Sequence, residues 1–450
     1  MKRPAHKKFK KFLRLQQSFI IVALLCSLVF AFYFYAGTGL ESFLWKFVLL
    51  TLLTDFLYTA LHIFRKPIKH RRLRFDPSKL TIVIACYNGE DVIGDTIESA
   101  MVHVPTHQII VVSDASTDAT ASVARSYGTR VYINDRNMNK ALSISNVMKH
   151  VTTPYVLILD DDTLIGKAFI PTSLLDRGYA AVAFNVMPLQ GSGLLNKLQR
   201  FEYRKSMFFG KNLRARAGAI GNISGAIGLF KTADLMQQVP LHSGQYGGED
   251  QQRTAFVHLY GKGKGVTYTD TLVETKVPPT LKSFFKQRAF RWNRAVPELF
   301  MVYWKILLNP KHHYLLKVDK AYQIFWYTTD PLRAVLMWAA LLYPASLLSL
   351  YAIYLFLSIA KWIKMGHQDA FWIVLVFPVY HQLQTFCRFI ANLYWLKVKV
   401  DYMFRHKLHR LVDGRSLAVE YTFVAVFITL IWTVASTTAI RLSDPFAAGF

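Results

Sequence analysis

The chain has 450 residues, of which 52% are hydrophobic and 18% charged, and its formal net charge is +26. This balance excludes an ordinary soluble enzyme, because soluble domains carry about 25% charged residues. We interpret the basic excess as a membrane-topology signal and an attraction to anionic lipid, rather than as nucleic-acid binding, since no nucleic-acid motif accompanies it. The 3 cysteines do not form a disulfide framework, and none has metal-ligand spacing.

The first elements in chain order are two predicted membrane spans. Residues 18–37 carry no charge and are long enough to cross a bilayer, and residues 43–64 are nearly as apolar. A cleaved signal peptide is disfavoured for the first run, because the run exceeds the usual apolar length of about 15 residues and a second span follows it. Basic segments precede the first run and follow the second, which predicts that the middle of the chain is cytoplasmic.

Three more apolar, aromatic-rich stretches follow the middle of the chain and predict spans at residues 333–360, 370–394 and 417–440. The sequence therefore predicts a multi-pass protein of the plasma membrane with about five spans. Asp55 in the second span and Arg388 in the fourth are ionisable groups in apolar surroundings. Such groups predict either the lining of a glycan channel or a structural pair between helices.

Residues 80–300 have a different pattern, in which short apolar runs alternate with amphipathic stretches. Strands are predicted at residues 80–88, 107–113, 129–135 and 154–162, and helices at 91–103, 121–128 and 140–151. This alternation predicts an α/β domain with a mostly parallel sheet. Ligands in such sheets bind at the carboxyl ends of the strands.

Polar clusters fall at these strand ends, namely Tyr87 with Asn88, Asp114, and the triplet Asp160-Asp161-Asp162. Because successive side chains of a strand alternate faces, Asp160 and Asp162 are predicted to point the same way and Asp161 the other. Two converging carboxylates suit Mg²⁺ or Mn²⁺, which take oxygen ligands from protein and substrate phosphate. A solvated acidic turn is the alternative, and the triplet alone does not decide between them.

Six motifs occur in order along the middle of the chain: VIACYN, VVSDASTDAT, LDDDT, SGAIGLF, GGEDQQRT and KQRAFRW. Together they resemble the signatures of membrane-embedded processive family-two glycosyltransferases, the hyaluronan, chitin, cellulose and poly-N-acetylglucosamine synthases. The resemblance implies a Rossmann-like GT-A domain inserted between transmembrane helices. It divides the chain into residues 1–77 with two spans, 78–280 with the catalytic domain, 281–320 with amphipathic interface helices, and 321–450 with about three spans.

For the donor, the resemblance implies that Tyr87 and Asp114 hold uracil, since a ring can stack and a carboxylate can accept the N3–H. Lys140 matches a family lysine near the nucleotide that could contact the diphosphate; a surface lysine is the alternative. Asp160 and Asp162 match the D-x-D element and would hold Mg²⁺ or Mn²⁺ beside the phosphates, with Asp160 also near the substrate.

For the acceptor, the resemblance implies that Asp250 is the base, placed at the start of a helix with its pKa raised by apolar walls and Glu249. The alternative for this GED sequence is an ordinary acidic helix N-terminus. Ser224 and Gly225 resemble the loop that faces the acceptor sugar, for which a plain strand and turn is the alternative.

The motif KQRAFRW departs from the family, whose members commonly show Q-x-x-R-W. Here Arg288 begins R-x-x-R-W, and Gln287 lies one residue too early. The resemblance implies that Arg291 contacts the diphosphate and that Trp292 is a platform for the acceptor. Arg288 either replaces the family glutamine or faces lipid head groups, because residues 281–304 also read as a basic interfacial helix.

These observations predict an inverting polysaccharide synthase that uses a UDP-sugar, most simply UDP-GlcNAc or UDP-glucose, and exports a β-linked glycan. A lipid glycosyltransferase with a ceramide or polyprenyl-phosphate acceptor is the alternative, and a transporter or receptor that only binds nucleotide-sugar is a second. The basic loop at residues 396–415 is a candidate gating loop, although it lacks the signature expected of hyaluronan synthases. Which sugar is used, which linkage forms and how many subunits assemble are open at this point.

Overall fold

A computed structural model describes residues 40–404, apart from 168, 242–247, 294–295 and 341–343. The chain divides into two compact units. Unit 1 combines Met1–Arg65, Leu332–Gln382 and Ile428–Phe450, and unit 2 combines Lys66–Pro331 and Leu383–Phe427. The predicted catalytic domain, 78–280, and the predicted interface helices, 281–320, both fall within unit 2.

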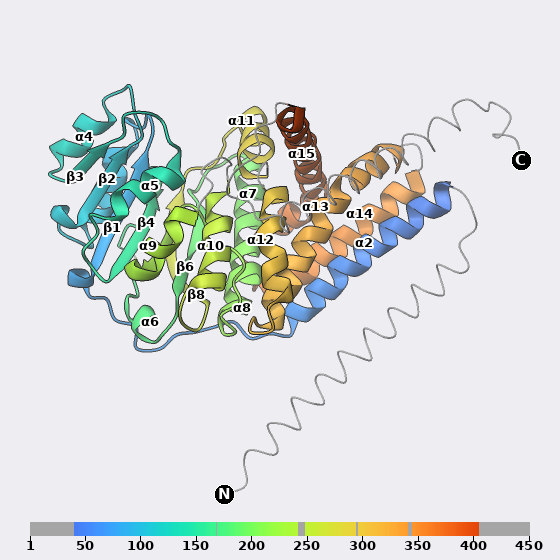
Figure 1. Ribbon diagram of the computed structural model, residues 1–450. Helices are drawn as coiled ribbons and strands as arrows, with labels where there is room; N and C mark the ends of the chain where they lie inside the picture. Colours follow the sequence, from blue (N-terminus) through green and yellow to red (C-terminus); the bar gives the residue numbers. More distant parts are fainter. Residues whose placement is uncertain (1–39, 168, 242–247, 294–295, 341–343, 405–450) are drawn as a thin grey trace, which may run out of the picture. The chain divides into compact units, whose positions relative to one another are not determined.

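Unit 2 is built on one sheet with the strand order β3-β2-β1-β4-β7-β6-β8-β5. Its first four strands are mutually parallel and alternate along the chain with short helices (Figure 1). This confirms the predicted alternation for β1 (Leu80–Cys86), α3 (Ile93–Met101), β2 (Ile109–Ser113), α4 (Thr120–Ser126), β3 (Arg130–Ile133), α5 (Lys140–Met148) and β4 (Tyr155–Asp160).

The second half of the sheet has mixed strand directions. β7 (Ile227–Lys231) is antiparallel to both β4 and β6 (Ala181–Pro188), whereas β8 (Val266–Thr275) is parallel to β6 and antiparallel to β5 (Thr163–Leu164). β3, β2, β1, β4, β6 and β8 therefore run in one direction and β7 and β5 in the other, which agrees with the predicted mostly parallel sheet. Strand direction depends on the long connections between strands, which the local hydrophobic pattern does not reveal.

The core of unit 2 surrounds the parallel strands. Every residue of β1 and β2 is buried, as expected when helices cover both faces of parallel strands. Burying an Ile, Val or Leu side chain completely contributes about 1.5–3 kcal/mol. The strand ends therefore project from a rigid base, which is what a precise site requires.

Short helices and a π-helical segment connect the remaining strands. α6 (Ser173–Asp176) precedes β6, and α7 (Leu194–Lys205) continues into a π-helical segment, Ser206–Asn212, and then α8 (Leu213–Ala215). α9 (Thr232–Gln238) follows β7, and α10 (Glu249–Tyr260) precedes β8.

The prediction of one basic interfacial helix over residues 281–304 is wrong. α11 (Leu281–Gln287) passes into a π-helical turn, Arg288–Trp292, and a separate helix α12 (Val296–Leu308) follows. Asn293 closes the π-helical turn. Its backbone N–H and its Nδ2 both donate to the Arg288 carbonyl, at 3.2 Å and 2.7 Å.

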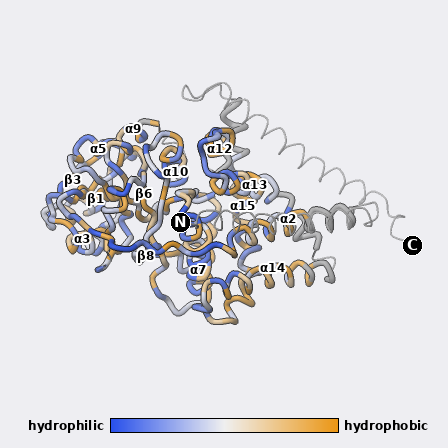
Figure 2. Tube along the Cα trace, turned by 90° about the horizontal axis from the view of Figure 1, so that it is seen from below, coloured by the Kyte–Doolittle hydropathy of each residue, from blue (hydrophilic) through white to orange (hydrophobic). Residues whose placement is uncertain are grey.

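Unit 1 contains α2 (Leu40–Ile63) and α14 (Pro344–Lys364), which pack together, and parts of α13 (Tyr314–Ala340) and α15 (Phe371–Phe404). Hydrophobic residues run along α2 and α14 (Figure 2). The single span predicted at 333–360 is wrong, because these residues include the end of α13 and the start of α14. Pro344 opens α14, where a residue without an N–H is tolerated only at a helix start.

In the part of the chain that the structure describes, one segment, Phe371–Trp395, is long and apolar enough to cross a membrane. It coincides with the span predicted at 370–394, and Leu52–Ile63 forms a shorter apolar helix. The spans predicted at 18–37 and 417–440 lie outside the described residues. The predicted basic loop at 396–415 is helical as far as Phe404, where α15 ends.

The two ionisable residues predicted in spans belong to different units. In unit 2, Arg388 on α15 forms an ion pair with Asp330 on α13 and donates to Thr385 Oγ1 at 3.0 Å. In unit 1, Asp55 on α2 is buried, and Lys361 on α14 is a cation within its electrostatic reach. The Arg388 contact favours the structural pair between helices over the channel lining.

Candidate active site

Tyr87 and Asp114 lie next to each other at the ends of two parallel strands. The register pairs Cys86 of β1 with Ser113 of β2, so each residue of interest follows directly after a paired position. Tyr87 is 51% exposed, whereas Asp114 is buried and accepts a hydrogen bond from Asn134 Nδ2 at 2.8 Å. An exposed ring thus lies beside a fixed carboxylate, an arrangement suited to a planar base.

Asp118, in the same motif as Asp114, has a structural role. Its carboxylate accepts from the Thr120 N–H and the Glu90 N–H, both at 3.1 Å. In return Glu90 Oε2 accepts from the Ala119 N–H at 2.7 Å. These bonds tie together the loops that follow β1 and β2, so Asp118 caps a turn.

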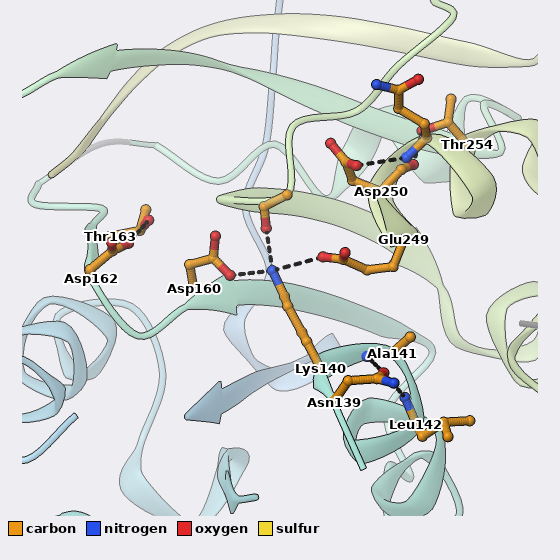
Figure 3. A network of polar contacts seen from close by, with 12 residues as sticks. Asn139, Lys140, Ala141, Leu142, Asp160, Asp162, Thr163, Glu249, Asp250 and Thr254 are labelled. Carbon is orange, nitrogen blue, oxygen red and sulfur yellow. Dashed lines mark hydrogen bonds and ion pairs between the residues drawn. The ribbon is translucent and has the colours of Figure 1, made fainter. Parts of the chain in front are cut away.

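The members of the aspartate triplet have different partners, but only Asp160 belongs to a strand, so the predicted alternation does not extend to Asp161 and Asp162, which form a turn. Asp160 ends β4, and Asp162 accepts from Thr275 Oγ1 at 3.3 Å. Asp161 instead interacts with the Cys86 thiol. Figure 3 shows Asp160 turned toward Lys140 and Asp162 beside Thr163, past the end of the strand.

Lys140 joins the strand end to the helix that carries the predicted base. It begins α5, and its Nζ contacts Asp160, the Gly225 carbonyl at 2.8 Å and Glu249 at 3.6 Å (Figure 3). Burial lowers the pKa of Lys140, but the Asp160 and Glu249 carboxylates outweigh it and leave the pKa raised. Lys140 is therefore no isolated surface lysine.

Burial disfavours the ionised form of the carboxylates at the strand end. Burial raises the pKa of Asp160 to about 6 even though Lys140 opposes this shift. The pKa of Asp162 is also raised, first by burial and then by Asp161. An added cation would relieve both effects.

The donor set at this strand end fits a hard divalent cation. Asp160 and Asp162 offer carboxylate oxygens, the ligands that Mg²⁺ and Mn²⁺ prefer, while substrate phosphate and water complete such sites. Within the described ranges, no group of three or more His, Cys, Asp and Glu side chains is arranged to hold a metal. Protein ligands alone would thus be few, as is usual for Mg²⁺ sites that share ligands with phosphate.

Asp250 occupies the second position of α10, directly after Gly248 and Glu249. Its Oδ1 accepts from the Gln251 N–H at 2.8 Å, and its Oδ2 from Asn222 Nδ2 at 3.3 Å. Burial, and then the negative charge of Glu249, raise the pKa of Asp250. This is the direction expected for a proton acceptor that works near neutral pH.

A side chain of α13 contacts the loop that precedes Ser224. Lys320 donates to the Gly221 carbonyl at 2.7 Å, and Arg214 of α8 forms a buried ion pair with Asp319. Ser224 and Gly225 follow this loop, and Gly225 contacts Lys140 through its carbonyl. The positions of Asn222 and of the Ser224-Gly225 loop therefore depend on contacts with α13.

Replacing Gly221 by Ala is expected to lower the free energy of unfolding by about 1–3 kcal/mol, as overpacked buried sites do. A Cβ at Gly221 would lie 1.8 Å from Asp319 Oδ2, so the Arg214 pair would have to move. Gly225→Ala is the matched control, since its Cβ would meet Lys140 Nζ at 3.7 Å, an ordinary contact. Thermal unfolding of both variants checks this, and equal midpoints would contradict it.

The residues of the R-x-x-R-W motif take different positions. Arg288 is 4% exposed, forms an ion pair with Glu202 at 2.8 Å, and lies with its guanidinium 3.8 Å from the Trp292 ring centre. It therefore does not face lipid head groups. Trp292 is 39% exposed, and its ring centre lies 6.2 Å from that of Tyr203. Arg291 is also exposed. The motif thus presents a tryptophan face and an arginine above a buried, charged support.

Removing this support is expected to destabilise unit 2. Arg288→Met takes away the cation of a buried pair with Glu202, a change that costs about 3–5 kcal/mol in proteins. Thermal unfolding followed by tryptophan fluorescence measures it. Arg291→Met, an exposed arginine three residues along, is the control and is expected to unfold like the unchanged protein.

Three residues near Asp250 were not predicted from the sequence: Asn222, Arg253 and Lys211. Asn222 and Lys211 stand far from Asp250 in sequence, and nothing in their local pattern marks them. Arg253 is buried above the Phe230 ring and lies three residues after Asp250 on α10. Helical spacing within GEDQQR could have identified Arg253, because residues three apart share a helix face.

The fold resembles that of a solved glycosyltransferase. A mannosyltransferase from Pyrobaculum calidifontis, solved with GDP-Man and Mn²⁺, aligns over 78% of this chain and 99% of its own, with a TM-score of 0.53 and 16% sequence identity. At this identity the likeness establishes the fold alone. The chain therefore has a Rossmann-like fold of the GT-A type.

The family follows from the sequence itself. Residues 81–237 match the profile described as "Glycosyl transferase family 2", so this segment is a family-2 glycosyltransferase domain. The match confirms the family-two part of the resemblance, over the segment that contains the first four motifs.

Curated relatives of this domain are synthases. The chain is 27% identical over 259 residues to poly-beta-1,6-N-acetyl-D-glucosamine synthases of Staphylococcus aureus (strain MSSA476) and Staphylococcus epidermidis. Each alignment covers 55% of this chain and 62% of the relative. The chain thus spans less than two thirds of the length of the curated relatives that it matches.

Proposed function

We propose that this protein is an inverting, processive glycosyltransferase that extends a β-linked glycan from a UDP-sugar. The observation that carries the proposal is the Lys140 cluster, in which one ammonium contacts Asp160 at the donor end of the sheet and Glu249 beside Asp250. Donor carboxylates and base therefore lie around one centre. The relatives named as poly-N-acetylglucosamine synthases favour UDP-GlcNAc, with UDP-glucose as the competing donor.

In this proposal the donor binds along the ends of β1, β2 and β4. Tyr87 offers its exposed face to uracil, and Asp114 accepts the N3–H of the base. Asp160 and Asp162 would hold Mg²⁺ or Mn²⁺ against the diphosphate, and the bound cation would neutralise charge on the departing UDP. Lys140 and the exposed Arg291 add positive charge for the phosphates.

The acceptor binds on the other side of the Lys140 cluster, between Trp292 and the Ser224-Gly225 loop. Asp250 accepts the proton of the acceptor hydroxyl while that oxygen forms a bond to the anomeric carbon. The bond from this carbon to the phosphate oxygen breaks, and its electron pair leaves with UDP. Attack from the face opposite the leaving group inverts the anomeric centre.

Membrane insertion and export belong to the same proposal. The apolar segment Phe371–Trp395 supports one span, and the spans predicted at 18–37, 43–64 and 417–440 would make the protein multi-pass in the plasma membrane, with its catalytic domain cytoplasmic. A growing glycan that starts in the cytoplasm would leave through these helices.

The test is to incubate membranes containing the full-length protein with single labelled UDP-sugars and Mn²⁺ or Mg²⁺. The expected result is UDP release together with a high-mass product that a glycan-specific hydrolase digests. Membranes carrying the Asp250→Asn variant serve as the control. A labelled lipid bearing one sugar would instead establish the lipid glycosyltransferase alternative, and binding without UDP release would establish a receptor or transporter.

A further inference from the structure

A buried lysine that the proposed mechanism does not use lies beside the base. Lys211 belongs to the π-helical segment Ser206–Asn212 and is 4% exposed. Its Nζ donates to Ser224 Oγ, and Asp250 is the carboxylate whose charge acts on it. Among the residues that the structure describes, Ser224 is its one hydrogen-bond partner, although an ammonium carries three N–H donors.

This environment differs from that of the other buried lysine near the site. Lys320 donates to the Gly221 carbonyl at 2.7 Å, lies 3.7 Å from Asp319 and stands 4.1 Å from the Tyr303 ring centre. Its charge is therefore compensated by structural partners. Lys211 has a hydroxyl as its hydrogen-bond partner, and the carboxylate whose charge acts on it is Asp250 of the candidate site.

Charged groups approach Asp250 from several elements. Glu249 raises the pKa of Asp250, whereas Lys140 and Arg253 lower it. Lys140 is already engaged with Asp160 and Glu249. Further groups that the charge of Asp250 reaches are Lys211 from the π-helical segment, Tyr303 from α12, and Lys320 and Tyr327 from α13.

We propose that Lys211 is a positioning residue for Asp250: its ammonium keeps the carboxylate ionised, and its bond to Ser224 holds the acceptor loop against the base. The inference rests on the proposed function and adds a residue to it. A cation beside a carboxylate favours the ionised form, which is the form that can take a proton. Burial lowers the pKa of Lys211 to about 7, with Asp250 opposing, so its charge changes within the working range of pH.

The test is the pH dependence of kcat/KM for nucleotide release by the full-length protein in membranes, between about pH 5 and 9. Lys211→Met removes the cation, so the acid limb, where Asp250 gains its proton, is expected to move up by about one pH unit. Lys211→Arg keeps the charge, and its acid limb is expected to stay in place. Lys262→Met, an exposed lysine outside the site, is the control for removal of a positive charge.

The decline of kcat/KM at alkaline pH, its alkaline limb, is a second and independent test of Lys211. Activity of the unchanged protein is expected to decline as Lys211 loses its proton, starting near its pKa of about 7. Arginine does not lose its proton in this range, so Lys211→Arg is expected to move the alkaline limb upward even if Lys211→Met does not fold.

Acid and alkaline limbs that match the unchanged protein in both variants would overturn the role of Lys211 while leaving the proposed function intact. An unchanged alkaline limb in Lys211→Arg alone would overturn it equally if Lys211→Met yields no folded protein. If the unchanged protein releases no nucleotide from any donor, the proposed function fails first, and the role of Lys211 fails with it.

Discussion

Replacing Asp250 by Asn is expected to reduce nucleotide release about 1,000-fold, the loss typical of removing a general base. The amide keeps the shape of the side chain and can still meet Asn222, but it cannot accept the proton of the acceptor hydroxyl. Binding of UDP is expected to persist, because Tyr87, Asp114 and the strand-end carboxylates are unchanged. Initial rates of UDP release and equilibrium binding of labelled UDP separate these two properties.

Glu249→Gln is the matched control, since it makes the same carboxylate-to-amide change one residue earlier. Its effect is expected to be much smaller. Removing the negative charge of Glu249 lowers the pKa of Asp250, so the acid limb of kcat/KM should move to lower pH. The ionised form of Asp250 is the active one. Activity is therefore present above the raised pKa of Asp250 and is lost as the pH falls through that pKa. Turnover by Asp250→Asn at the rate of the unchanged protein would remove Asp250 as the base.

Replacing Asp162 by Asn is expected to abolish the dependence of UDP binding on Mg²⁺ or Mn²⁺ and to reduce turnover on the order of 100-fold. The carboxylate is buried enough that its pKa is raised, and it accepts hydrogen bonds from Thr163 and Thr275 that an amide oxygen can also accept. The substitution therefore removes the charge while keeping these contacts. Titration of UDP binding with each cation measures the effect.

Asp161→Asn is the control for this experiment, because it changes the neighbouring carboxylate by the same atoms. Asp161 interacts with Cys86 on the other side of the strand end, so its replacement is expected to leave the dependence on cation in place. Equal loss of that dependence in both variants would mean that the triplet acts through its total charge. Full cation dependence in Asp162→Asn would refute the assignment of Asp162 as a metal ligand.

Those parts of the fold that depend on short segments could be predicted from the sequence. β1, β2 and β4 are apolar runs followed at once by polar turn residues, and this local pattern determines where each strand ends. Tyr87, Asp114 and Asp160 lie at or directly after those ends. Knowing the ends was therefore enough to expect these residues at one edge of the sheet.

Contacts made by tertiary packing could not be predicted in this way. Lys211 reaches Ser224 from a π-helical segment, and Lys320 reaches Gly221 from α13, although each has the local pattern of an ordinary helical lysine. The antiparallel β7 is a similar case, because its direction is set by the long excursion before it. Hydropathy located apolar helices but not their ends, as Pro344 within the predicted third span shows.

The π-helical turn at Arg288–Trp292 also changes how the residues of the R-x-x-R-W motif correspond to Q-x-x-R-W. In the family pattern the glutamine stands four residues before the tryptophan, a spacing that puts both on one face of an α-helix. Gln287 stands five residues before Trp292, but a π-helix bonds residue i to i+5, as the Asn293 N–H does with the Arg288 carbonyl at 3.2 Å. Residues five apart in this turn therefore share a face.

The π-helical turn thus accommodates the spacing of five residues between Gln287 and Trp292, where the family pattern has four. The turn places Gln287 and Trp292 on one face, whereas Arg288 pairs with Glu202 and lies over the Trp292 ring. Within the described part of the chain, Gln287 Oε1 is buried and has no hydrogen-bond partner, unlike the paired Arg288. We therefore propose that the family glutamine corresponds to Gln287 in space, although Arg288 holds its position in the sequence.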